Sequence, residues 1–152
     1  MTALKQGASP SREVARTVEW DCTQLLFRFY YWFDSFRYEE MVALFLPDGV
    51  WHRAGKVLRG REEIIAILRE RSTTQRVRHV LTNVLVDAVD ATNASVVLYL
   101  TAYQFDSGQP VNTPPTITSP SLLLLVTATL VKTSDGWLIA EQRTTREFEF
   151  AS

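Results

Sequence analysis

The sequence contains a single cysteine, Cys22, and no excess of charge of either sign. One cysteine can form neither an internal disulfide nor a metal site built from several cysteines. Sixteen Lys and Arg against seventeen Asp and Glu leave a formal net charge of -1, so no overall field attracts nucleic acid or an anionic membrane. Apolar runs such as 122–126 are far too short to span a bilayer, and residues 1–16 lack the apolar run of a signal peptide. We therefore expect a cytoplasmic protein that binds neither nucleic acid nor membranes.

The sequence also lacks the short motifs that mark many cofactor-dependent and nucleophilic enzymes. It has no Gly-x-Ser-x-Gly turn, no Walker loop and no Gly-x-Gly-x-x-Gly loop. Its two histidines, His52 and His79, show no spacing typical of a metal site. Hydride transfer, phosphoryl transfer and classical serine hydrolysis therefore lose most of their support, and we expect neither a metal nor another cofactor. Acid–base chemistry on a small, largely apolar molecule remains.

The length and composition are those of a globular chain. A chain of 152 residues lies within the range of a single domain that buries one core without disulfides. Hydrophobic residues make up 46% and charged residues 22% of the chain, which is ordinary. Residues 1–8 are mostly small and polar, and we interpret them as a loose lead-in to one domain over residues 9–152.

The first half of the sequence has the periodicity of helices. Ser9-Pro10-Ser11 is a typical helix start, because a hydroxyl accepts a free backbone N–H and proline fits the first turn. From there, apolar residues recur at spacings of three and four from Val14 to Phe36, which predicts one long helix with a break at 35–37. The other elements predicted before residue 75 are helices over 38–46 and 61–71, and a hairpin that joins 50–53 to 56–58.

After Gln75 the pattern changes to alternation and long β-prone runs. The predicted strands are 76–88, 94–105, 121–133 and 136–150. Residues 106–120 hold four prolines and are predicted to form a long loop between two strands. Helices followed by strands indicate an α+β protein, in which an antiparallel sheet curls around the long helix and leaves a pocket at its wide mouth.

Asp34 and His79 are the candidates for acid–base catalysis. In an alternating strand, His79 shares a face with Leu81, Asn83 and Leu85, a mixed composition that is typical of a ligand pocket. Asp34 ends the most apolar stretch of the long helix, where a carboxylate without a partner is costly. A carboxylate that accepts one imidazole N–H leaves the other ring nitrogen as a base. The alternatives are a hydrogen-bonded structural histidine and an aspartate that caps the second helix.

Aromatic residues before and after Asp34 are candidate substrate contacts. Tyr30 lies one helical turn earlier on the same side, where its phenol could polarise a substrate carbonyl. Packing is the commoner role of an aromatic residue at this spacing. Trp51 and His52 lie on opposite faces of a short strand, so at most one of them points into a pocket.

The last predicted strand supplies a charged candidate. Arg143 shares a face with Trp137 and Ile139 under strand alternation, so it could meet an anionic group in a cavity. An ion pair at the sheet edge is the alternative. The candidate substrate contacts are thus Tyr30, Trp51, Asn83 and Arg143.

Six segments, in their order and spacing, resemble the SnoaL-like domains of the nuclear-transport-factor-two-like superfamily. They are 25–34 (LLFRFYYWFD), 37–45 (RYEEMVALF), 47–51 (PDGVW), 58–64 (LRGREEI), 78–84 (RHVLTNV) and 136–140 (GWLIA). The resemblance implies a cone-shaped, curved antiparallel sheet wrapped around three N-terminal helices, with an internal hydrophobic cavity. It also implies a homodimer or a larger homo-oligomer.

Members of this superfamily include polyketide cyclases, scytalone dehydratase, steroid isomerases, bile-acid dehydratases and limonene epoxide hydrolases. The resemblance matches Asp34 to the helix aspartate and His79 to the strand histidine of the dehydratase-like branch. In that branch the pair removes a proton next to a carbonyl. The tyrosine that some members place five residues before the aspartate falls here on Phe29, and Tyr30 is the candidate to replace it.

The leading hypothesis is therefore a dehydratase, isomerase or cyclase that needs no cofactor. It would act through Asp34 and His79 on a small, largely apolar carbonyl compound, either aromatic or polycyclic. The alternative is a non-catalytic ligand-binding or assembly module, because the superfamily also contains the small subunit of ring-hydroxylating dioxygenases.

Overall fold

The computed structural model describes residues 9–151, so the lead-in expected over residues 1–8 lies outside the described residues. Helix α1 (Arg12–Asp34) begins where the Ser-Pro-Ser segment predicts, and the Ser11 hydroxyl caps it by accepting the backbone N–H of Val14 at 3.3 Å. Its buried side chains form the expected apolar stripe. In residues 9–151, no helix is both long enough and apolar enough to cross a membrane.

After α1 the chain enters a short second helix, α2 (Tyr38–Val42). The prediction of a helix over 38–46 is wrong in its second half, because strand β1 (Phe45–Arg53) begins there. The backbone N–H of Ile139 donates to the Leu44 carbonyl at 2.7 Å, and the first residue of β1 pairs with the same isoleucine. These tertiary contacts outweigh the local helical preference of the segment.

The hairpin and the third helix follow the prediction. β1 pairs with β2 (Lys56–Arg59) around Ala54 and Gly55, which both have positive φ. A type I′ turn requires this backbone conformation at its two central residues. Helix α3 (Gly60–Arg69) comes directly after β2.

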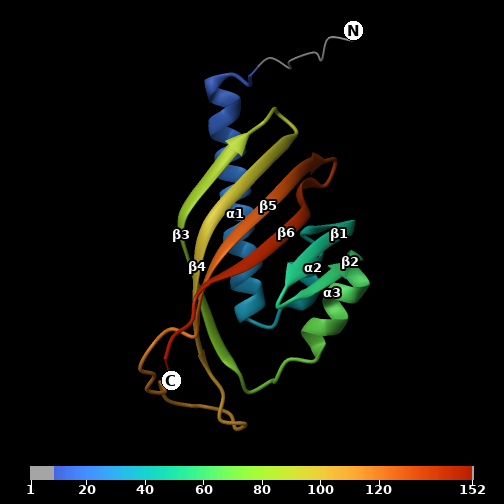
Figure 1. Cartoon of the computed structure of the whole chain (residues 1–152). Coiled ribbons are helices and arrows are strands. Elements are labelled where there is room, and N and C mark those ends of the chain that lie inside the picture. The colour runs from blue at the N-terminus through green and yellow to red at the C-terminus, as the bar shows by residue number, and fades with distance from the viewer. Residues whose placement is uncertain (1–8, 152) are drawn as a thin grey trace.

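Four long strands complete the fold. They are β3 (Arg76–Ala88), β4 (Asn93–Phe105), β5 (Leu122–Thr133) and β6 (Gly136–Phe148). The sheet order is β2-β1-β6-β5-β4-β3, and the neighbouring strands are antiparallel except for β1 and β6, which run parallel. Figure 1 shows a curved, open sheet with α1 along one face and α3 beside the β1–β2 hairpin. The α+β prediction is confirmed, with the parallel pair as an exception to the antiparallel pattern.

A β-bulge in β3 changes which residues face the helices. The register of β3 with β4 shifts around Asn83, whose φ is 52°. A bulge moves the alternation by one residue, so Val84 and Val86 pack against the core, whereas Leu85 is 64% exposed. The prediction that His79 shares its face with Asn83 and Leu85 is therefore wrong, and Asn83 is exposed.

A second bulge lies in β6 at Ala140. Strand β5 pairs with Ile139 and with Glu141 but skips the residue between them. Gln142 is consequently buried on the inner face of the sheet, and Arg143 is exposed on the outer face. The prediction that Arg143 shares a face with Ile139 is wrong for the same reason.

Aromatic rings fill the space between α1 and β1. Phe29, Phe45 and Trp51 are buried, with ring centroids 5.6 Å to 6.1 Å apart. Cys22 lies in the same core, and burial raises the pKa of its thiol to about 12. Since the thiolate is the reactive form, this cysteine is a structural residue.

Candidate active site

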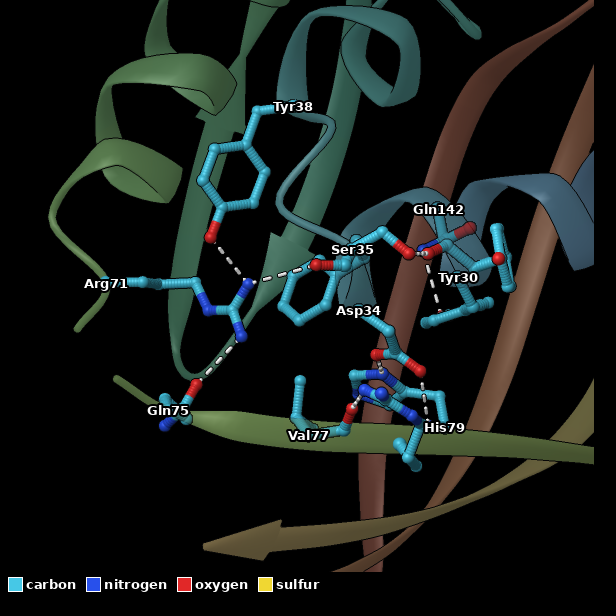
Figure 2. Close-up of polar contacts among 12 residues, drawn as sticks. Tyr30, Asp34, Ser35, Tyr38, Arg71, Gln75, Val77, His79 and Gln142 are labelled. Atoms are coloured by element: carbon cyan, nitrogen blue, oxygen red, sulfur yellow. Dashed lines mark hydrogen bonds and ion pairs between the residues drawn. The ribbon is translucent and has the colours of Figure 1, made fainter. Parts of the chain in front are cut away.

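Asp34, the last residue of α1, and His79, on β3, form a hydrogen-bonded pair (Figure 2). His79 Nδ1 lies 2.5 Å from Asp34 Oδ1, and the backbone N–H of His79 donates to Asp34 Oδ2 at 2.8 Å. The histidine side chain is 9% exposed and the aspartate side chain 8%. Because an ionised carboxylate only accepts hydrogen bonds, this contact places the proton of a neutral imidazole on Nδ1 and its lone pair on Nε2.

The position of β3 at the edge of the sheet explains how the pair forms. Within residues 9–151, β4 is the one strand that pairs with β3, so some backbone N–H groups of β3 have no strand partner. Asp34 accepts one of them at His79. A buried carboxylate is costly without partners, and here both oxygens bind the same residue. This arrangement fixes the imidazole in one orientation.

Two aromatic rings of α1 flank the imidazole. The ring centroids of Tyr30 and Phe33 lie 5.2 Å and 5.0 Å from that of His79. The Tyr30 hydroxyl accepts a hydrogen bond from Gln142 Nε2 at 3.2 Å, and burial raises the pKa of Tyr30, so the phenol stays protonated. No sequence pattern marks Gln142, because strand alternation without the bulge at Ala140 directs it away from the helices.

Replacing Tyr30 with phenylalanine is expected to lower the free energy of unfolding by about 1–2 kcal/mol. In the described residues, Tyr30 is the one hydrogen-bond partner of the Gln142 side chain, whose Oε1 already has none. Urea unfolding of Tyr30→Phe measures the loss. Tyr31→Phe is the matched control, because Tyr31 is 67% exposed and losing its hydroxyl should change stability by less than about 0.5 kcal/mol. Equal stability of the two variants would show that the Tyr30–Gln142 bond contributes nothing in solution.

Two hollows adjoin the Asp34–His79 pair along β3. The larger one, about 360 Å³, is lined mainly by apolar groups of Phe27, Tyr30, Tyr31, Asp34, Arg78, His79, Val80 and Leu81. The smaller one, about 260 Å³, is more polar and is lined by Asp34, Phe36, Thr73, Thr74, Gln75, Arg76, Arg78, Pro110 and Val111. Asp34 and Arg78 line both hollows. Exposed residues such as Tyr31 and Arg78 in their walls show that both open at the surface.

The other predicted substrate contacts lie away from these hollows. Trp51 is buried in the aromatic core, and His52 lies on the opposite face of β1, as alternation predicts. Arg143 takes part in a cluster on the outer face, where Glu141 Oε1 lies 2.7 Å from His52 Nε2 and 3.3 Å from Arg143 Nη2. Asn83 lines neither hollow beside the pair. Over residues 9–151, no three His, Cys, Asp or Glu side chains are grouped so as to hold a metal ion.

A curved, open sheet packed against one long helix is the architecture of NTF2-like proteins with a cystatin-like fold, one of which, from Novosphingobium aromaticivorans, has a TM-score of 0.70 to this chain. The family model described as a SnoaL-like domain matches residues 15–143. The chain therefore belongs to the SnoaL-like domain family. No curated protein matches the chain.

Solved structures of similar proteins share this architecture. A protein from Novosphingobium aromaticivorans, provisionally named a scytalone dehydratase, is 19% identical with a TM-score of 0.77, and the match covers 92% of each chain. The protein Aln2 from a Streptomyces species is 22% identical with a TM-score of 0.73, over 91% of this chain and 94% of Aln2. A Catenulispora acidiphila protein in complex with S-DNPA is 22% identical with a TM-score of 0.71, over 86% of this chain and 94% of that one. At these identities the likeness establishes the fold.

Proposed function

We propose that the chain is an acid–base enzyme without a cofactor, a dehydratase, isomerase or cyclase in which His79 is the general base and Asp34 orients it. The observation that carries this proposal is the 2.5 Å contact between His79 Nδ1 and Asp34 Oδ1, made by two side chains that are nearly buried. An imidazole held by a carboxylate at one nitrogen offers the other nitrogen as a base. In residues 9–151, no hydrogen bond occupies Nε2 of His79.

The reaction that suits this pair is removal of a proton next to a carbonyl. Nε2 of His79 takes the proton from carbon, and the electron pair of the broken C–H bond moves to the carbonyl oxygen as an enolate. The carboxylate of Asp34 stabilises the imidazolium that forms. In a dehydration, the enolate electrons then form the new C=C bond and the bond to the β-hydroxyl breaks. The imidazolium returns its proton to that oxygen, so water leaves and the base is restored.

The larger hollow favours a small, largely apolar carbonyl compound, either aromatic or polycyclic. Its volume of about 360 Å³ suits a small molecule, and aromatic and aliphatic side chains form most of its wall. The family also supports a role on small molecules, since one structural relative holds S-DNPA and another is provisionally named a scytalone dehydratase. The ring of Tyr30, 5.2 Å from the imidazole between ring centroids, is part of the wall that would contact the substrate, while its hydroxyl is held by Gln142.

The proposal is tested with a panel of bicyclic and tricyclic β-hydroxy ketones. Formation of a conjugated product changes the ultraviolet absorbance, so turnover is followed directly. We expect the wild-type protein to convert at least one member and the folded Asp34→Ala variant to convert none at a measurable rate. Binding of panel members without turnover by the wild type would contradict the proposal and favour the alternative, a non-catalytic ligand-binding module.

A further inference from the structure

The smaller hollow beside Asp34 has two arginines in its wall that form no ion pair with its acidic residue. Arg76 and Arg78 line it, and Asp34 is the one acidic residue in its wall. Arg76 Nη2 donates to the Val111 carbonyl at 2.9 Å, and Arg78 Nη1 donates to the Val77 carbonyl at 2.6 Å. Neither guanidinium belongs to any ion pair within residues 9–151. Since a guanidinium has five N–H donors, both arginines keep donors for a ligand.

Arg71 adds a third positive charge next to the same hollow. Its Nη2 donates to Oε1 of Gln75 at 2.8 Å, and its Nη1 donates to the Tyr38 hydroxyl at 2.7 Å (Figure 2). These acceptors are neutral, and burial lowers the pKa of Arg71, as expected for a cation that has lost solvent. Because the Gln75 oxygen is engaged, the amide NH₂ of Gln75 remains as a further donor in the wall of the hollow.

The acidic groups around the hollow are already hydrogen-bonded to other partners. Both carboxylate oxygens of Asp34 bind His79. Asp106, close by, accepts hydrogen bonds from Thr74 Oγ1 at 2.7 Å and from the backbone N–H of Gly108 at 2.9 Å. Arg76 and Arg78 form no ion pair with either carboxylate within residues 9–151, so a carboxylate that enters the hollow beside them would gain charge-assisted hydrogen bonds.

We propose that the smaller hollow binds a carboxylate of the substrate, with Arg76 and Arg78 as its ligands. This inference rests on the proposed function, because it names the substrate of the same site. Asp34 and Arg78 line both hollows, so a molecule with its rings in the larger hollow and its carboxylate in the smaller one passes beside His79. The substrate class is thus an aromatic or polycyclic carboxylic acid, and the arginines determine its orientation.

The inference is tested by binding, without turnover, using two probes that differ in charge. The probes are 1-naphthaleneacetate and its neutral amide, and calorimetry measures their affinities for the full chain. We expect the wild type to bind the carboxylate at least about tenfold more tightly than the amide. The double variant Arg76→Gln/Arg78→Gln should bind the two probes within about twofold of each other. Its affinity for the amide should stay close to that of the wild type, which also shows that the hollow remains folded.

Arg12→Gln is the matched control, because Arg12 begins α1 and lies about 33 Å along the helix from Asp34. It should keep the wild-type preference. The inference is overturned if the wild type binds neither probe, if it binds both equally, or if the double variant keeps the preference. His79→Ala should keep the preference for the carboxylate, so loss of turnover in that variant and failure of the carboxylate site are separate results.

Discussion

The His79→Ala variant is expected to lose about 10²–10⁴-fold in kcat/KM on any substrate that the wild type converts, which is the usual contribution of a positioned general base. Alanine removes the proton acceptor while leaving both hollows in place. Initial rates at substrate concentrations well below KM measure the loss directly. Circular dichroism and urea unfolding establish that the variant is folded, so that a lost site is distinguished from a lost fold.

The chain provides a matched control for this substitution. His52 is its other histidine, and it lies on the outer face of the sheet, 2.7 Å from Glu141. His52→Ala should therefore keep the wild-type rate within about twofold, as expected for a side chain remote from the chemistry. A folded His79→Ala variant that retains more than about a tenth of the wild-type rate would show that His79 is not the base.

The Phe29→Ala variant is expected to lose about 3–5 kcal/mol of the free energy of unfolding. Phe29 is 0% exposed, and its ring packs edge-to-face against Tyr30, Phe45 and Trp51 at centroid distances of 4.9–5.6 Å. Its removal leaves a cavity that these rigid rings cannot close, and lost aromatic contacts add to the lost burial.

Phe27→Ala is the comparison for this stability measurement. Phe27 lies two residues earlier on the same helix and is 41% exposed. Its truncation should cost less than about 1.5 kcal/mol, since much of the ring is already in water. A Phe29→Ala variant as stable as Phe27→Ala in urea would contradict the packing of the aromatic core.

This packing also separates the roles of two neighbouring aromatic residues of α1. The resemblance in the sequence leads us to expect a tyrosine five residues before Asp34, and this chain has Phe29 there. The ring of Phe29 faces Phe45 and Trp51 in the core, whereas Tyr30 lies against the imidazole of His79. Tyr30 is therefore the phenol next to the histidine, one helical position further along.

Most of the elements could be predicted from local patterns. The helix start at Ser11 depends on a hydroxyl cap, and at the 54–55 turn Gly55 favours the positive φ that the turn needs, so both are signalled locally. Asp34 and His79 stand out in the sequence because a carboxylate in an apolar helix and an imidazole in an apolar strand are both costly without partners. The two residues are 45 positions apart in the sequence, so local patterns cannot predict that they meet. Only the folded structure brings them into contact.

The failed predictions of strand bounds and strand faces depend on tertiary hydrogen bonding. β1 replaces the end of the second predicted helix because Ile139, far along the chain, pairs with its first residue. The bulges at Asn83 and Ala140 reverse strand alternation, and no local residue pattern signals them. As a result the sequence does not indicate Gln142, and it predicts Arg143 on the wrong face of the sheet.

The most direct test of the Asp34–His79 pair is the position of the ring proton of His79 in solution, read from ¹⁵N–¹H correlation NMR of the imidazole. We predict a proton on Nδ1 with a resonance shifted downfield by the bond to Asp34, and an unprotonated Nε2. In Asp34→Ala this downfield signal should disappear. A wild-type His79 protonated on Nε2, or an unchanged Nδ1 signal in Asp34→Ala, would show that the carboxylate does not orient the imidazole and would contradict the proposed base.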